Sequence, residues 1–216
     1  MTNVKFAVFL AASLLVGMGA REYARASMAS RLHDPTPRLW GRQTLSVKAW
    51  FDPFGSGVLP ALILFLWATG AMFLPPPVAY PKPAPIDPNY FRNRSRDTVI
   101  TSLAGPAANL VLGAAGGLAL RTGITGDLGL VALAFMLSNL SLVVFHLVPI
   151  PGLDGARMLA LVLPPRAAEV YRNADQYLAL IVLIVLFLFA GPLVSIVNSL
   201  TDSLCTLFSG LACPPY

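Results

Sequence analysis

Long apolar runs, separated by polar and proline-rich stretches, dominate the pattern of the chain. Four of the runs approach the roughly 20 residues that a helix needs to cross the hydrocarbon core of a bilayer. They cover residues 4–20, 99–120, 128–148 and 177–197. The first run resembles a secretory signal, but its helical pattern continues to about Leu32, so we interpret it as a retained span. The pattern predicts an all-α, polytopic membrane bundle of four to five spans.

A fifth apolar run, 57–74, is shorter, is interrupted by Pro60 and Gly70, and predicts either a full span or a re-entrant segment. If it is re-entrant, nearly all lysines and arginines of the loops fall on one side of the membrane, and only Lys5 and Arg121 fall on the other. A full span would divide these charges almost evenly. The positive-inside rule therefore favours four crossings plus a re-entrant element, with both termini outside the cytoplasm.

The punctuation by proline and glycine divides the chain into five parts. The segment 34–56 predicts a short β-hairpin, because Thr44, Leu45 and Val47 lie between turn-forming residues. The proline-rich stretch 75–90 predicts an extended surface linker. The expected parts are a first span (1–33), the hairpin loop (34–56), a re-entrant or short span with the linker (57–98), two core spans (99–157), and a loop, last span and tail (158–216).

Composition and charge agree with a membrane protein. Hydrophobic residues make up 56% of the chain and charged residues only 12%, about half the share in soluble domains. The net charge of +5 comes from basic residues scattered between apolar runs, which records membrane orientation and makes a nucleic-acid partner unexpected. The two cysteines, Cys205 and Cys213, are too few for a cysteine-built zinc site. They form either a disulfide or two buried thiols.

Charged groups inside or beside apolar spans occur at two places. Arg21, Glu22 and Arg25 lie at the end of the first span, and His146 and Asp154 lie at the end of the 128–148 span. Because an ionisable group at membrane depth is costly, such a group indicates function by default.

Short motifs tie these two places together. They are Gly41-Arg42-x-Thr44-Leu45, Asp52-Pro53-x-Gly55, Gly105-Pro106-x-x-Asn109, Asn139-Leu140 and Pro149-x-Pro151-x-Leu153-Asp154-Gly155. Through them the chain resembles the site-2 protease family of intramembrane zinc metalloproteases, in its short bacterial form, from the first span to about Arg157. The resemblance implies a multi-pass protein of a bacterial cytoplasmic (inner) membrane. It also implies that a His-Glu-x-x-His motif and the aspartate of the last motif once held zinc.

The departures from the family pattern fall on the metal ligands. Arg21 and Arg25 occupy the two histidine positions, while Glu22, the vestigial general-base position, and Asp154 remain. In addition, Trp50 and His146 replace a histidine and an asparagine of the family. Arginine offers no lone pair to a metal, and catalytic zinc needs three protein ligands. We therefore expect zinc to be lost, no other cofactor, and no peptidase activity by the family mechanism.

The same residues suggest what replaces the metal. We hypothesise a buried charge cluster of Arg21, Glu22, Arg25 and Asp154, with His146 and Asn139 as polar neighbours. In the alternative, both arginines extend to the lipid headgroups. A relocated metal site would have only His33 and His146 to draw on, without a third ligand.

These expectations lead to one functional hypothesis and one alternative. The hypothesis is a catalytically inactive pseudoprotease that acts as a binding, scaffold or accessory subunit. Its partners would be membrane lipid and another membrane protein or transmembrane helix. The alternative is an active intramembrane metalloendopeptidase with a non-standard site. A transporter or channel is disfavoured, because the spans hold too few polar residues to line a path.

Overall fold

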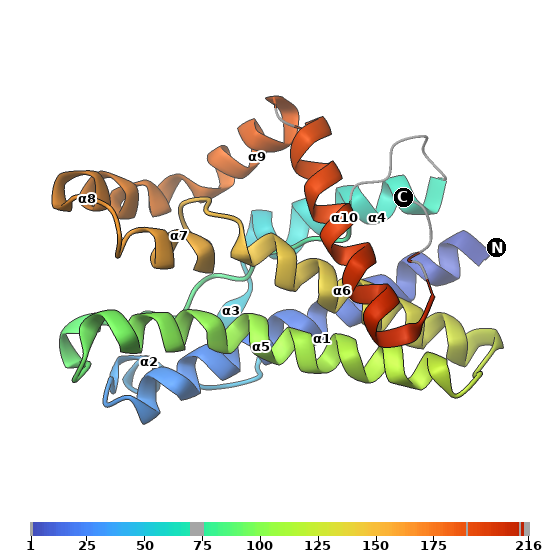
Figure 1. Ribbon diagram of the computed structural model, residues 1–216, viewed down its shortest axis with the longest axis horizontal. Helices are drawn as coiled ribbons and strands as arrows, with labels where there is room; N and C mark the ends of the chain where they lie inside the picture. Colours follow the sequence, from blue (N-terminus) through green and yellow to red (C-terminus); the bar gives the residue numbers. More distant parts are fainter. Residues whose placement is uncertain (1, 70–75, 189, 212, 214–216) are drawn as a thin grey trace.

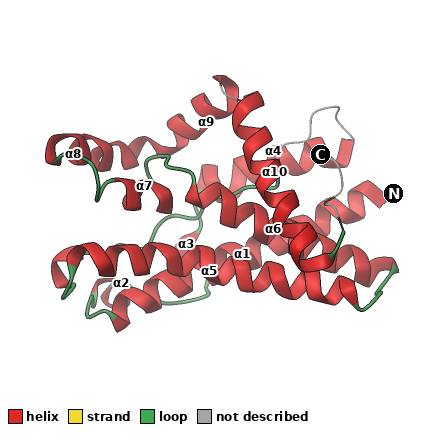
Figure 2. Ribbon diagram, viewed as in Figure 1, coloured by secondary structure: helices red, strands yellow, loops and turns green. Residues whose placement is uncertain are grey.

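The fold comes from a computed structural model that describes residues 2–69, 76–188, 190–211 and 213. The described residues are helical or irregular and contain no strand (Figure 2). Three helices are long and apolar enough to cross a membrane: α1 (Thr2–Arg31), α5 (Arg94–Arg121) and α6 (Gly126–Leu147). The prediction of an all-α membrane bundle is thereby confirmed in its coarse form.

Helices α1, α5 and α6 pack against one another and form the centre of the molecule (Figure 1). Glycines of α5 allow the close approach to α6. A Cβ atom at Gly113 would lie 2.6 Å from Leu140 Cδ2, and one at Gly116 would lie 2.8 Å from the backbone nitrogen of Met136. Small residues at helix contacts are the usual means of packing in lipid, where no hydrophobic effect draws helices together.

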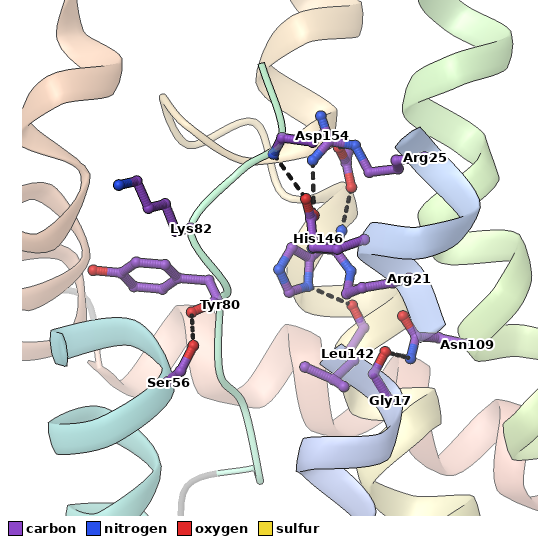
Figure 3. Close-up of polar contacts among 12 residues, drawn as sticks. Gly17, Arg21, Arg25, Ser56, Tyr80, Lys82, Asn109, Leu142, His146 and Asp154 are labelled. Carbon is purple, nitrogen blue, oxygen red and sulfur yellow. Dashed lines mark hydrogen bonds and ion pairs between the residues drawn. The ribbon is translucent and has the colours of Figure 1, made fainter. Parts of the chain in front are cut away.

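An excursion of the chain leaves this centre and returns to it. The π-helical turn η1 (Pro53–Val58) leads into α4 (Leu59–Thr69), and residues 76–87, here called the return segment, run back in extended form. The Tyr80 backbone N–H donates to Gly55 O (3.0 Å), and the Ser56 hydroxyl donates to Tyr80 O (3.0 Å; Figure 3). The two ends of the excursion therefore lie side by side.

The remaining helices follow α6 in the sequence. In chain order they are α7 (Asp154–Leu159), α8 (Pro165–Asn173), the 3-10 turn η3 (Ala174–Tyr177), α9 (Leu178–Leu188) and α10 (Ala190–Ser209). Helix α10 crosses over α5 and α6 and packs on both (Figure 1). A disulfide joins Cys205 to Cys213 at the end of α10, which decides between the two alternatives that the sequence left open.

Three of the five predicted apolar runs coincide with helices that are long enough to span a membrane. Among the described residues, neither of the other two runs coincides with one continuous helix of that length. Residues 177–197 fall on α9 and α10 and include residue 189, outside the described residues. Residues 57–74 include α4, but 70–74 also lie outside them. The count of four to five spans is therefore not confirmed.

Two expectations about the connecting segments need correction. Residues 34–56 form the helical turns α2 (Thr36–Leu39) and α3 (Val47–Trp50) and not a β-hairpin. Pro37 fits the first turn of a helix, and the β-forming residues are too few for a ladder. The proline-rich stretch 75–90 is extended, but its described part is not a surface linker, since Val78, Ala79 and Tyr80 are buried. Proline lacks an N–H group, so a proline-rich extended segment can be buried with few donors to satisfy.

The contact between η1 and the return segment gives a first prediction. A Cβ atom at Gly55 would overlap the Tyr80 ring and its carbonyl oxygen, whereas one at Gly57 would meet nothing closer than Phe51 Cζ at 3.3 Å. Gly55→Ala should therefore cost about 1–3 kcal/mol of stability through overpacking, and Gly57→Ala should cost much less. Thermal unfolding in detergent measures both. Equal melting temperatures for the two variants would contradict this placement of the return segment.

Candidate functional site

The site forms where the polar end of α1 meets the start of α7. Arg21, Glu22 and Arg25 lie within about one turn of α1, and Asp154 is the first residue of α7, after the turn that ends α6. Figure 3 shows Arg21, Arg25 and Asp154 converging from these elements. All four side chains are only 2% exposed. The structure thus brings together the four residues of the hypothesised charge cluster.

Within the cluster each carboxylate contacts both guanidinium groups. Arg21 Nη2 donates a hydrogen bond to Asp154 Oδ2, and Arg21 Nη1 lies 3.5 Å from Glu22 Oε1. Arg25 Nη1 donates to Glu22 Oε1 (2.9 Å), and Arg25 Nε lies 3.1 Å from Asp154 Oδ1. Positive and negative groups therefore alternate, and neither guanidinium extends to the surface of the molecule as the alternative required.

Burial and charge act against each other on Asp154. Burial raises the pKa of its carboxyl group above the ordinary value, and the positive charges of Arg25 and Arg21 oppose that shift. Without the arginines, the charges that oppose the effect of burial would be lost.

Two groups that the sequence did not predict also contact the cluster. The Ala84 backbone N–H, in the return segment, donates to Glu22 Oε2 (2.9 Å), so both oxygens of Glu22 are engaged. Arg157 Nη1 lies 3.6 Å from Asp154 Oδ1, in an i,i+3 pair along α7. That spacing is visible in the sequence and could have identified Arg157. No side-chain pattern could have identified a backbone donor.

The return segment is itself held beside the cluster by an arginine. Arg42 Nη2 donates to Lys82 O (2.5 Å), and the Lys82 backbone N–H donates to Trp50 O (2.8 Å). Burial lowers the pKa of Arg42, while the negative charge of Glu22 opposes that shift. The family-motif residue Arg42 thus positions the return segment, from which the Ala84 N–H reaches Glu22.

Glycines of the motifs make room for the cluster. A Cβ atom at Gly105 of α5 would lie 3.0 Å from Arg25 Cδ and 3.3 Å from Arg21 Nη2, so the two arginine side chains lie directly against the α5 backbone. At Gly155 a Cβ atom would overlap the Leu147 carbonyl oxygen. Helix α7 therefore starts in close contact with the end of α6, which fixes Asp154 beside α1.

His146 and Asn139, the two expected polar neighbours, each make hydrogen bonds with groups outside the charge cluster. His146 is 1% exposed, and its Nδ1 lies 3.0 Å from Leu142 O. Asn139 accepts a hydrogen bond from Asn109 Nδ2 (2.9 Å), which also lies 3.1 Å from Gly17 O (Figure 3). This asparagine network joins α6, α5 and α1, about one turn of α1 before Arg21. His33, the second histidine, is exposed in the loop after α1.

The donor set at the cluster does not fit the zinc ion that the resemblance implies. Arg21 and Arg25 have no lone pair to donate, and the oxygens of Glu22 and Asp154 contact guanidinium or backbone N–H groups. Two carboxylates are fewer than the three protein ligands of catalytic zinc sites. Among the described residues, no group of three or more histidine, cysteine, aspartate or glutamate side chains is placed to hold a metal.

Comparison with known proteins finds relatives over most of the chain. It is similar to "Putative zinc metalloprotease YwhC" of Bacillus subtilis, with 29% identity over 221 residues that cover 95% of this chain and 93% of the relative. It is also similar to "Putative zinc metalloprotease Rip2" of Mycobacterium tuberculosis, with 33% identity over 188 residues that cover 84% of this chain and 67% of the relative. No family model matches the chain. No solved structure matches it either.

The cluster geometry predicts a large effect of removing one arginine. Arg21→Ala should cost about 3–5 kcal/mol of stability, because it breaks a buried ion pair with Asp154 and leaves that carboxylate only Arg25 and the more exposed Arg157. Lys5→Ala is the matched control, since Lys5 pairs with Asp127 at 3.3 Å between exposed side chains, and such pairs contribute little. Unfolding in detergent compares the two variants. If Arg21→Ala is no less stable than Lys5→Ala, the cluster does not stabilise the fold.

Proposed function

The chain belongs to the site-2 protease family of membrane zinc metalloproteases, and on that premise we propose that it acts without peptidase activity, by binding. The observation that carries the proposal is the occupation of both histidine positions by arginines. Each of these arginines contacts the two carboxylates that remain of the family motifs. The charge that a zinc dication would supply to this site is supplied by guanidinium groups.

The chemistry of peptide hydrolysis argues in the same direction. The family mechanism needs a metal to lower the pKa of the attacking water and to polarise the scissile carbonyl, and guanidinium groups cannot generate that nucleophile. A general base also needs a carboxylate oxygen within reach of the water. Both oxygens of Glu22 already accept hydrogen bonds, Oε1 from Arg25 and Oε2 from the Ala84 N–H, which argues against that role for Glu22. The names of the relatives describe those proteins as zinc metalloproteases. The residues of this chain favour a pseudoprotease.

A binding role requires the family architecture but not its metal. The packed centre of α1, α5 and α6 supports such a role, together with the apolar side chains that these helices expose on their outer faces, such as Val8, Val16 and Val111. We propose that the chain is a scaffold or accessory subunit that holds another membrane protein or a transmembrane helix without cleaving it. Exposed apolar faces at membrane depth suit both lipid and such a helix.

Metal analysis of the purified chain tests the proposal. We expect well below one zinc per chain by elemental mass spectrometry, because the cluster does not supply three protein ligands. The variant Arg21→His/Arg25→His should bind close to one zinc, since two histidines together with Asp154 restore a three-ligand set. Adding Asp154→Asn to this variant is the control and should remove the metal again.

The opposite result would favour the metalloendopeptidase alternative. If the unchanged chain holds about one zinc that is lost on Asp154→Asn, the arginines do not replace the metal and the proposal is wrong. A melting curve of each variant shows whether a loss of zinc is only a loss of fold.

A further inference from the structure

A pocket of about 420 Å³ opens next to the charge cluster. It lies between the end of the return segment with η2 (Pro88–Tyr90), the first turns of α5, and α7 with the residues after it. This volume is in the range of about 300–1,000 Å³ that is typical of small-molecule sites. The proposed binding role does not use this pocket.

Three arginines from three different elements line the pocket. They are Arg25 of α1, Arg94 of α5 and Arg157 of α7, and none of the described residues that line it is an aspartate or glutamate. Asp97, one residue before the lining Thr98, is paired with Arg96 Nε at 3.1 Å and lies outside the lining. The polar part of the wall is therefore positive.

The charge cluster does not neutralise these arginines. Arg21, Arg25 and Arg157 face two carboxylates, Glu22 and Asp154, which leaves one formal positive charge in excess. Arg94, at the first position of α5, adds a second charge, while the N-terminus of this helix is capped by Asn93 and carries Asp97 in its first turn. Arginine forks are groups that proteins use to bind phosphate.

The rest of the wall is apolar, and the pocket lies where spans end. Ile86, Phe91 and Leu161 line it together with prolines of the return segment. The polar end of α1, the start of α5 and the helix that follows α6 meet there, which is the level of the lipid headgroups if these helices cross the bilayer. A ligand that fits has an anionic head and an apolar body at the membrane interface. Basic pockets between transmembrane helices are known to bind phospholipid head groups.

We propose that this pocket binds the phosphodiester head group of an anionic phospholipid, with Arg94 and Arg157 contacting the phosphate and the apolar wall contacting the start of an acyl chain. Such a lipid would connect the return segment, α5 and α7 at the membrane surface. The proposal goes beyond the pseudoprotease assignment and does not depend on it, because the arginine-lined wall is present whether or not the chain holds a metal.

Lipid binding to the full chain in detergent tests the proposal. The probes are phosphatidylglycerol, zwitterionic phosphatidylcholine and inorganic phosphate, and the readouts are retained lipid in native mass spectrometry and the shift in melting temperature. We expect phosphatidylglycerol to be retained and to raise the melting temperature, and phosphatidylcholine to do neither. Arg94→Gln should weaken phosphatidylglycerol binding about tenfold, as the loss of one charge-assisted hydrogen bond implies.

Two further variants separate the pocket from general charge effects. Arg92→Gln is the control, because it removes the same charge two residues away from Arg94 at a residue outside the pocket lining. It should bind phosphatidylglycerol as the unchanged chain does. Thr98→Trp should block binding while all arginines remain, since Thr98 lines the pocket and Trp fills it.

Three outcomes would overturn the proposal. One is equal binding of phosphatidylglycerol and phosphatidylcholine, and another is an equal loss in Arg92→Gln and Arg94→Gln. The third is a stabilisation by inorganic phosphate as large as that by the lipid, which would assign the site to a free anion.

Discussion

Two carboxylates buried beside the end of a membrane span require compensating charge, and the rest of the site is arranged around that requirement. Glu22 and Asp154 are each contacted by both Arg21 and Arg25 at the junction of α1 and α7. A buried ion pair adds little stability compared with an apolar pair, but the loss of one partner is costly because it leaves an unpaired charge. The arginines are therefore tied to the carboxylates, and neither pair of residues is free to change alone.

The backbone also contributes to the site, through glycines that leave space for the arginines and through a hydrogen bond to Glu22. Gly105 allows both arginines to lie against α5, and Gly155 allows α7 to begin directly at the end of α6, so that Asp154 reaches α1. The return segment contributes the Ala84 N–H to Glu22, and it is held in turn by Arg42. These contacts give residues of the family motifs a structural role at this site. The motifs position the elements, and this role does not need zinc.

The sequence predicted the parts of the fold that periodicity and motif order determine. The three core spans and the proximity of Arg21 to Asp154 belong to these parts, the second through the order of the family motifs. The burial of the return segment was missed, because its prolines are typical of surface linkers, and burial through backbone hydrogen bonds leaves no side-chain pattern. The hairpin was mistaken because three β-forming residues could not outweigh the helical turns at Thr36–Leu39 and Val47–Trp50. Arg157 was missed although its i,i+3 spacing from Asp154 was there to see.

A double-mutant cycle between Arg21 and Asp154 tests the charge cluster most directly, with Arg21→Met, Asp154→Leu and the double variant unfolded in detergent. If the two groups stabilise each other inside the protein, each single variant breaks their buried ion pair, and the double variant recovers much of the lost stability. We predict a coupling energy of about 2–3 kcal/mol. Losses that add within about 0.5 kcal/mol would show that the two residues act independently and would contradict the charge cluster.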